Sequence, residues 1–188
     1  MCIRDSLCPG QVVGVRMALL GLDLIGLKNP KETHDIKKII VYVEIDRCAT
    51  DAISYVTGVK LGRRSLKFKD YGIMAATFIN LETHAAFRIV STESARRRAD
   101  KYAPHIKDTH KQQLEAYKIM PLSELFEVSQ VSVKIEASDM PGPADYKSTC
   151  ETCGIMIRDK KEVVKKNRVY CHACADLAYY STIKTIMI

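Results

Sequence analysis

The sequence predicts an α+β protein: a core domain in which helices flank a mixed or antiparallel sheet, followed by a small zinc-ribbon or treble-clef-like module. Three observations support this prediction. Helical segments alternate with short β-branched runs, two of these runs have the pattern of a β-hairpin, and four cysteines form two pairs near the C-terminus. Apolar residues make up 47% of the 188-residue chain, enough for a packed core without disulfide bonds.

The first two helices and the strand between them have clear sequence signals. The first helix is expected to begin at Pro9, because proline is tolerated in a first turn, and to run to about Leu27 before Asn29-Pro30 ends it. Residues 38–45 are almost continuously β-branched, which predicts a central strand. A second helix is expected over Arg47–Val56, capped by Asp46 and ended by the following glycine.

The middle of the chain predicts more strands. Ser65–Lys69 alternates as a short strand, and Ala75–Asn80 with Ala85–Val90 predicts a hairpin around residues 81–84. The charged segment Ser91–Met120 is expected to be helical with a break at Pro104.

After that segment, one helical turn is expected over Ser123–Phe126 and a late strand over Val128–Ile135. The four parts of the chain are then a sequencing-adapter remnant at 1–6, the core domain at 7–136, a Pro- and Gly-containing linker at 137–147, and the cysteine module at 148–188. Residues 1–6, MCIRDS, are assigned to an adapter because they are the translation of a transposon end used in sequencing-library preparation.

Composition limits the class of function. The chain has no apolar run long enough for a spanning helix and no secretory signal, so we expect a cytoplasmic protein without membrane contact. The net charge of +7 permits contact with nucleic acid, but a charge of this size is more typical of a solvated surface, and nucleic acid is not the favoured partner.

The two cysteine pairs predict a structural zinc site formed by Cys150, Cys153, Cys171 and Cys174. Two cysteines three positions apart can place both sulfurs on one ion, and a forty-residue module needs the metal for its stability. Two disulfides, an iron–sulfur cluster or a redox site are the alternatives. Four thiolates close the coordination shell, which argues against a catalytic zinc.

The rest of the module carries weaker signals. Ile155–Val169 is expected to form a hairpin with its tip near residues 159–161, and a helix is expected from Ala173 to about Met187. Arg158–Arg168 is strongly basic, which fits either a nucleic-acid patch or a solvated hairpin. The segment contains no aromatic stacking platform, so the solvated hairpin is favoured.

Cys8 and Cys48 are the candidate residues of the core domain. Each lies at the start of a predicted helix, where the helix dipole stabilises a thiolate that can bind metal or act as a nucleophile. Buried and chemically inert cysteines are the alternative. We expect the two to converge on one cleft.

Three segments in chain order resemble the FmdE family, which takes its name from a component of formylmethanofuran dehydrogenase: LCPGQVVGVRMALLGL, VEIDRCATDAISYVTG and LGRRSLKFKDYGIMAATF. The resemblance is strong over Leu7–Val90 and extends through the cysteine module. It implies an α+β core domain, an intertwined homodimer, and association with a molybdenum- or tungsten-dependent oxidoreductase.

The resemblance also bears on the core cysteines. Cys8 and Cys48 match cysteines of the family, but relatives have two histidines at the positions of Arg4 and Ser6 and often a cysteine at that of Val59. A second metal ion in the core cleft is therefore implied by the resemblance, and its binding is expected to be weak in this chain.

Three functions are consistent with these features. The leading hypothesis is a zinc-binding, dimeric accessory protein whose core cleft handles a metal or ligand for an oxidoreductase, with that enzyme's subunits as partners. The alternative is a metal- or redox-responsive regulator whose zinc module binds nucleic acid or the transcription machinery. An independent enzyme with Cys48 as nucleophile ranks last, because the sequence offers no general base beside it.

Overall fold

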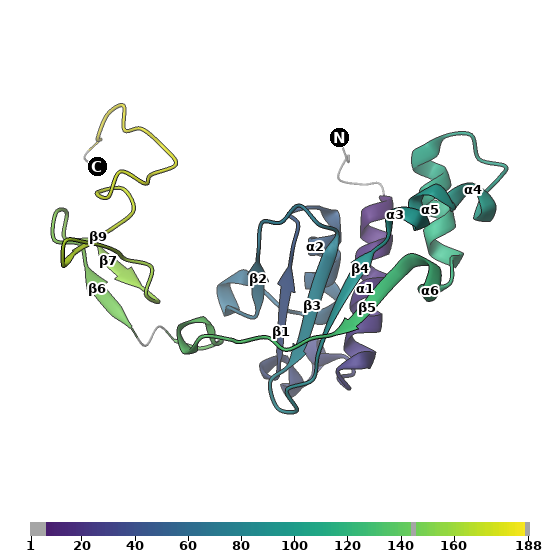
Figure 1. Cartoon of the computed structure of the whole chain (residues 1–188), viewed down its shortest axis with the longest axis horizontal. Helices are drawn as coiled ribbons and strands as arrows, with labels where there is room; N and C mark the ends of the chain where they lie inside the picture. The colour runs from purple at the N-terminus through teal and green to yellow at the C-terminus, as the bar shows by residue number, and fades with distance from the viewer. Residues whose placement is uncertain (1–6, 144–145, 187–188) are drawn as a thin grey trace. The chain divides into compact units, whose positions relative to one another are not determined.

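The computed structural model describes residues 7–143 and 146–186, and the chain divides into two compact units between Lys134 and Ile135 (Figure 1). The adapter expected at 1–6 lies outside the described residues. Among the described helices, none has the length and apolar character needed to cross a bilayer.

A mixed five-stranded sheet forms the centre of the first unit. The strand order is β2-β1-β3-β4-β5, and only the β1–β2 pair is parallel. The strands are β1 (Ile39–Val43), β2 (Leu66–Phe68), β3 (Ala75–Asn80), β4 (Ala86–Ser91) and β5 (Phe126–Gln130). The predicted α+β class with a mixed sheet is confirmed.

The β3–β4 hairpin forms where the sequence predicts it, with Ala75 opposite Val90 and Ile79 opposite Ala86. Side-chain hydrogen bonds shape its turn, because Asn80 Oδ1 accepts from the backbone N–H groups of Glu82 and Thr83.

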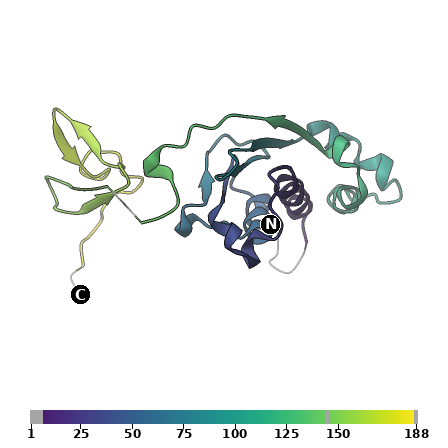
Figure 2. The same ribbon diagram turned by 90° about the horizontal axis from the view of Figure 1, so that it is seen from below.

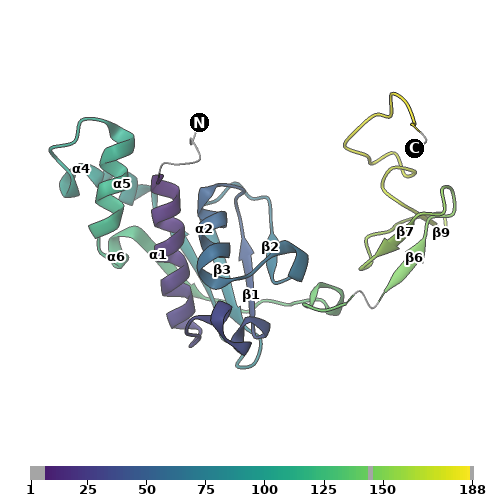
Figure 3. The same cartoon turned by 180° about the vertical axis from the view of Figure 1, so that it is seen from behind.

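Helices α1 (Pro9–Leu24) and α2 (Cys48–Thr57) lie side by side on one face of the sheet (Figure 2, Figure 3). Two glycines of α1 allow this close packing. A Cβ at Gly14 would lie 2.5 Å from the carbonyl oxygen of Ala49 in α2, and one at Gly21 would lie 2.4 Å from the ring of Phe78 in β3. The helix–helix and helix–sheet distances therefore depend on residues without side chains.

The first helix ends earlier than predicted. Gly26, with φ of 70°, lets the N–H of Leu27 bond the carbonyl of Leu22 and its own N–H bond that of Asp23. This left-handed glycine motif ends the helix before the chain reaches Pro30.

The segment after β4 folds into four short helices: α3 (Glu93–Arg97), α4 (Ala99–Tyr102), α5 (Thr109–Ile119) and α6 (Leu122–Leu125). The break around Pro104 is present and spans residues 103–108. Arg16 of α1 joins α5 to the core, because its guanidinium donates to the carbonyls of Tyr117 and Met120 at 2.6 Å each.

Strand β5 is displaced from the predicted 128–135. It begins at Phe126, directly after α6, and ends at Gln130 opposite Phe87. Pairing stops there because β4 begins at Ala86, so the alternating residues that follow lack a strand partner within the described sheet.

The second unit contains two small hairpins, one from β6 (Lys147–Thr149) and β7 (Met156–Arg158), the other from β8 (Val163–Lys165) and β9 (Arg168–Tyr170). The predicted single hairpin over 155–169 is wrong, because β7 pairs backwards with β6 and β8 pairs forwards with β9. The helix predicted from Ala173 is also absent from the described residues.

Candidate metal and ligand sites

The four cysteines of the C-terminal module converge on one point. The sulfurs of Cys150, Cys153, Cys171 and Cys174 all lie within 4.8 Å of one another. Each pair lies at a tight turn: the N–H of Gly154 bonds the carbonyl of Cys150, and the N–H of Ala175 bonds that of Cys171. Two equivalent turns thus face each other with their thiols directed inward.

The geometry fits a tetrahedral metal ion. Zinc–thiolate bonds of about 2.3 Å place the sulfurs of a tetrahedral site about 3.8 Å apart. The sulfurs of Cys153 and Cys171 are 3.8 Å apart, and the backbone N–H of Cys174 lies 3.4 Å from the Cys171 sulfur, where it stabilises a thiolate. The cluster can therefore bind a metal ion such as zinc.

The electrostatics of the cluster also favour a cation. Backbone N–H groups of Cys171 and Cys153 lower the pKa of Cys150 to about 6, whereas hydrogen bonds from the Cys153 and Cys171 thiols raise the pKa of Cys174 to about 12. Four thiolates at this spacing repel one another, so a divalent ion at their centre removes the conflict.

The hairpins are joined by Glu151, which lies between the first two cysteines. Its N–H donates to the carbonyl of Val169, and its carboxylate accepts from the N–H of Val169 and from Arg168. These bonds hold the first cysteine turn against β9. They also lower the pKa of Glu151, mainly through the bond from the backbone N–H of Val169.

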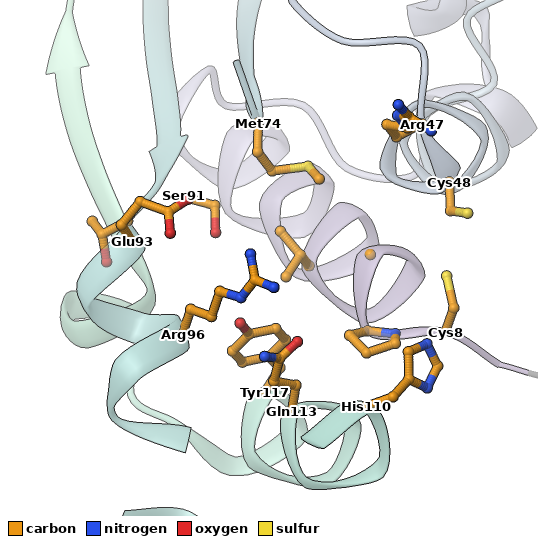
Figure 4. Close-up of a pocket in the computed structure, with 14 residues that line it drawn as sticks. Cys8, Arg47, Cys48, Met74, Ser91, Glu93, Arg96, His110, Gln113 and Tyr117 are labelled. Atoms are coloured by element: carbon orange, nitrogen blue, oxygen red, sulfur yellow. The ribbon is translucent and has the colours of Figure 1, made fainter. Parts of the chain in front are cut away.

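A second candidate site is a cleft of about 580 Å³ in the core domain, where the N-terminal ends of α1 and α2 face α3 and α5 (Figure 4). Cys8 and Cys48 both line it. Their placement follows from the α1–α2 packing, since a Cβ on Gly10 would lie 3.8 Å from the Cys8 sulfur and 3.6 Å from the Cys48 Cβ.

The two core thiols face each other across the mouth of the cleft, as Figure 4 shows. Cys8 caps α1 and is buried, and its N–H is held by the side chain of Gln11 at 2.9 Å. Cys48 is the first residue of α2 and is half-buried. The structure thus places both candidates in one cleft, as the sequence predicts, while their binding of a shared metal stays a prediction.

Sequence reasoning missed the opposite wall of the cleft, which comes from residues about one hundred positions away. His110, Gln113 and Tyr117 of α5 line it, together with Arg96 of α3. The spacing of three and four residues along α5 puts its three polar side chains on one helix face. That pattern is visible in the sequence, but nothing in the sequence shows which helix the face approaches.

The core cleft and the cysteine module differ as metal sites. Among the residues that the structure describes, the four module cysteines are the one group of three or more His, Cys, Asp or Glu side chains with ligand atoms this close together. In the cleft, the two thiols lack a third described ligand within the same distance. This agrees with the weak metal binding expected for the chain.

Family comparison decides the classification. Residues 4–127 match the family model described as "FmdE, Molybdenum formylmethanofuran dehydrogenase operon". The chain belongs to the FmdE family. The match confirms the resemblance carried by the three sequence segments. It covers almost all of the core domain and includes both cleft cysteines, whereas the cysteine module lies beyond the matched residues.

Two individual proteins similar to this FmdE-family chain were found. One is a probable S-adenosyl-L-methionine-binding protein of Archaeoglobus fulgidus, 25% identical over 96% of this chain and 52% of the relative. The chain thus spans about half the length of this curated relative.

The other is the crystal structure of an FmdE-like protein of tungsten formylmethanofuran dehydrogenase from Syntrophus aciditrophicus. It has a TM-score of 0.59 and 15% identity, covering 92% of this chain and 86% of that one. At this identity the likeness shows a shared fold.

Proposed function

We propose that the chain is a zinc-binding, dimeric accessory protein of an oxidoreductase system, in which the core cleft handles a metal or ligand and the cysteine module contacts a partner. One observation carries the proposal: in a member of the FmdE family, two cysteines at the starts of separate helices face each other in one cleft. Two adjacent helix N-termini also favour thiolates there.

The cleft proposal is tested by metal stoichiometry in the full chain. The protein as given should keep one zinc per chain after dialysis, held by the module cysteines, because two cleft thiolates alone bind zinc weakly. The double variant Arg4→His, Ser6→His should keep two, since nitrogen and sulfur ligands together suit zinc.

The control is Cys8→Ser in that double variant, which should return the content to one. A double variant that stays at one zinc, or a Cys8→Ser form that keeps two, would contradict the cleft as a metal site.

Copurification tests the link to an oxidoreductase. The FmdE family description names a molybdenum formylmethanofuran dehydrogenase operon, and the Syntrophus structure carries the tungsten enzyme's name. The chain acting as a non-catalytic subunit or accessory should copurify with a molybdenum- or tungsten-containing complex. S-adenosyl-L-methionine, the ligand in the Archaeoglobus relative's name, is a separate compound to test in the cleft.

The dimer is proposed from the family resemblance and from apolar side chains on one surface. Leu19 of α1, Ile119 at the end of α5 and Leu122 of α6 are exposed, and Leu19 and Leu122 border one shallow pocket. A second copy would bury them. Light scattering should give about twice the chain mass of 21.2 kDa.

Replacing Leu19 by Glu should shift that mass toward one chain, because it places a charge in the buried patch. Leu61→Glu is the control, since Leu61 is similarly exposed but does not border the pocket. A single-chain mass for the unmodified protein at every accessible concentration would refute the dimer.

The alternative is a regulator whose cysteine module binds nucleic acid. Most of its basic side chains have internal contacts, since Lys165 donates to the carbonyl of Ala175, Arg168 pairs with Glu151, and Lys160 lies over the Tyr146 ring. These contacts favour a stabilising role for the charges. Salt-dependent binding of DNA or RNA by the full chain would support the alternative instead.

A further inference from the structure

We propose that the core cleft binds a small organic anion, a carboxylate or phosphate group carried on an apolar body. The group is held by Arg96 and the polar face of α5, and the body extends toward Cys8 and Cys48. This inference rests on the proposal above that the cleft is a ligand site, and it names the class of ligand.

The wall opposite the cysteines consists mostly of hydrogen-bond donors. Arg96 extends from α3 toward the centre of the cleft, with the side chains of Gln113 and Tyr117 beside it (Figure 4). Burial raises the pKa of Tyr117, so its phenol keeps its proton and remains a donor at neutral pH. A guanidinium can donate two parallel hydrogen bonds to one carboxylate or phosphate.

These donors have no competing partners in the described part of the chain. The side chains of Arg96, Arg47, His110 and Gln113 make no hydrogen bond or ion pair there, whereas Arg16 of the same domain is held by two backbone carbonyls. Donors that line a cleft without internal partners are available to a ligand.

Charge and polarity set the class of that ligand. Two arginines and one histidine line the cleft, against a single acidic residue, Glu93, among its described lining. The balance therefore favours an anion. The remaining surface is apolar, formed by Pro9, Val13 and Met74. A bare inorganic ion would leave this surface uncovered, so the anion is expected to carry an apolar body.

The test uses two thiol reagents on the zinc-loaded full chain in a Cys2→Ser background at low ionic strength. Dithiobis(nitrobenzoate) is an aromatic carboxylate, and dithiodipyridine is its neutral counterpart. Each reacts when a thiolate attacks the reagent's disulfide and displaces one thiolate leaving group. Peptide mass spectrometry assigns the reaction to Cys8 or Cys48, and the ratio of the anionic to the neutral rate is the measured quantity.

Arg96→Gln should lower this ratio about two- to fivefold, the scale of one partly exposed charge contact. Arg96→Lys should restore part of the loss. Arg97→Gln should leave the ratio unchanged, because Arg97 is an equally exposed neighbour on α3 that does not line the cleft. Equal ratios in the Arg96→Gln and Arg97→Gln forms would overturn the proposal.

Competition separates the two anion classes. Benzoate should slow dithiobis(nitrobenzoate) if the cleft accepts a carboxylate, and phenyl phosphate should slow it if the cleft accepts a phosphate; protection by neither would overturn the proposal. The metal proposal is judged separately by zinc content. A ratio that depends on Arg96 in a protein whose cleft takes no metal would sustain this inference and reject the metal site alone.

Discussion

At the scale of single residues, Gly14 controls the position of both cleft cysteines. Its Cα faces the first turn of α2, and a Cβ there would lie 2.5 Å from the Ala49 oxygen and 2.8 Å from the Ala52 Cβ. Cys8 precedes α1 and Cys48 begins α2, so the distance between these helices sets the distance between the thiols.

Gly14→Ala is therefore expected to destabilise the protein. Alanine gains about 1 kcal/mol in helix propensity, but overpacking against backbone costs about 1–3 kcal/mol, and the contact distances place this case at the upper end. We expect a net loss of about 2 kcal/mol in the free energy of unfolding, measured by urea denaturation.

Gly62→Ala provides the matched control, because a Cβ there meets nothing within 4 Å. Its stability should change by no more than about 0.5 kcal/mol. Equal stability of the two alanine variants would show that α1 and α2 have room to separate.

At the scale of elements, Glu124 joins α6 to α3 and α4. Its carboxylate accepts from Tyr102 at 2.8 Å and from Arg98 at 3.1 Å. The hydrogen bond from Tyr102 is the main cause that lowers the pKa of Glu124 below its ordinary 4.5, with the nearby Lys101 and Arg98 adding to the shift. This connection supports the helices that carry the donor wall of the cleft.

The lowered pKa predicts how this connection depends on pH. A carboxyl whose folded pKa is depressed stabilises the fold above its unfolded pKa, and the contribution disappears as pH falls through the folded value. Glu124→Gln should therefore lower the urea midpoint more at about pH 7 than at about pH 3.

Glu127→Gln on β5 is the control for this pH dependence. Glu127 is exposed and makes no ion pair in the described part of the chain. Its midpoint should change little at either pH. A Glu124→Gln effect that is independent of pH would contradict a role for the ionised carboxylate.

At the scale of the whole molecule, the two units are stabilised in different ways. The core domain buries a large apolar cluster that includes Phe78, Met17 and Ile89. In the described part of the second unit, only Cys150 and Ala175 are buried. A module with so little apolar burial depends on its metal for stability.

Cys171→Ser in the full chain should therefore remove the module's zinc and unfold the module alone. Hydrogen exchange should become fast over residues 147–170 and stay slow over the strands of the core sheet, with zinc content falling accordingly. His172→Ser is the control, because His172 is exposed next to the same cysteine. Retained protection over 147–170 in the Cys171→Ser form would contradict metal-dependent folding.

Local signals in the sequence were enough to predict several features. β-branched runs, Pro9, Gly58 and the hairpin pattern placed most core elements, because helix and strand periodicity and capping act over a few residues. The CxxC spacing predicted which four cysteines meet. The zinc-module hairpins were mispredicted because either flank of residues 155–169 could supply the partner strand, and the cysteine turns select the outer ones.

The sequence by itself thus determined the α+β class, the family and the grouping of the module cysteines, all of which follow from neighbouring residues. Only the tertiary structure decided that β1 pairs in parallel with β2, that Gly14 brings the two core helices together, and that Arg96 and the α5 face lie opposite Cys8 and Cys48. The physical reason is that these contacts join segments far apart in the chain, and burial of one shared core, rather than any local pattern, selects which surfaces meet.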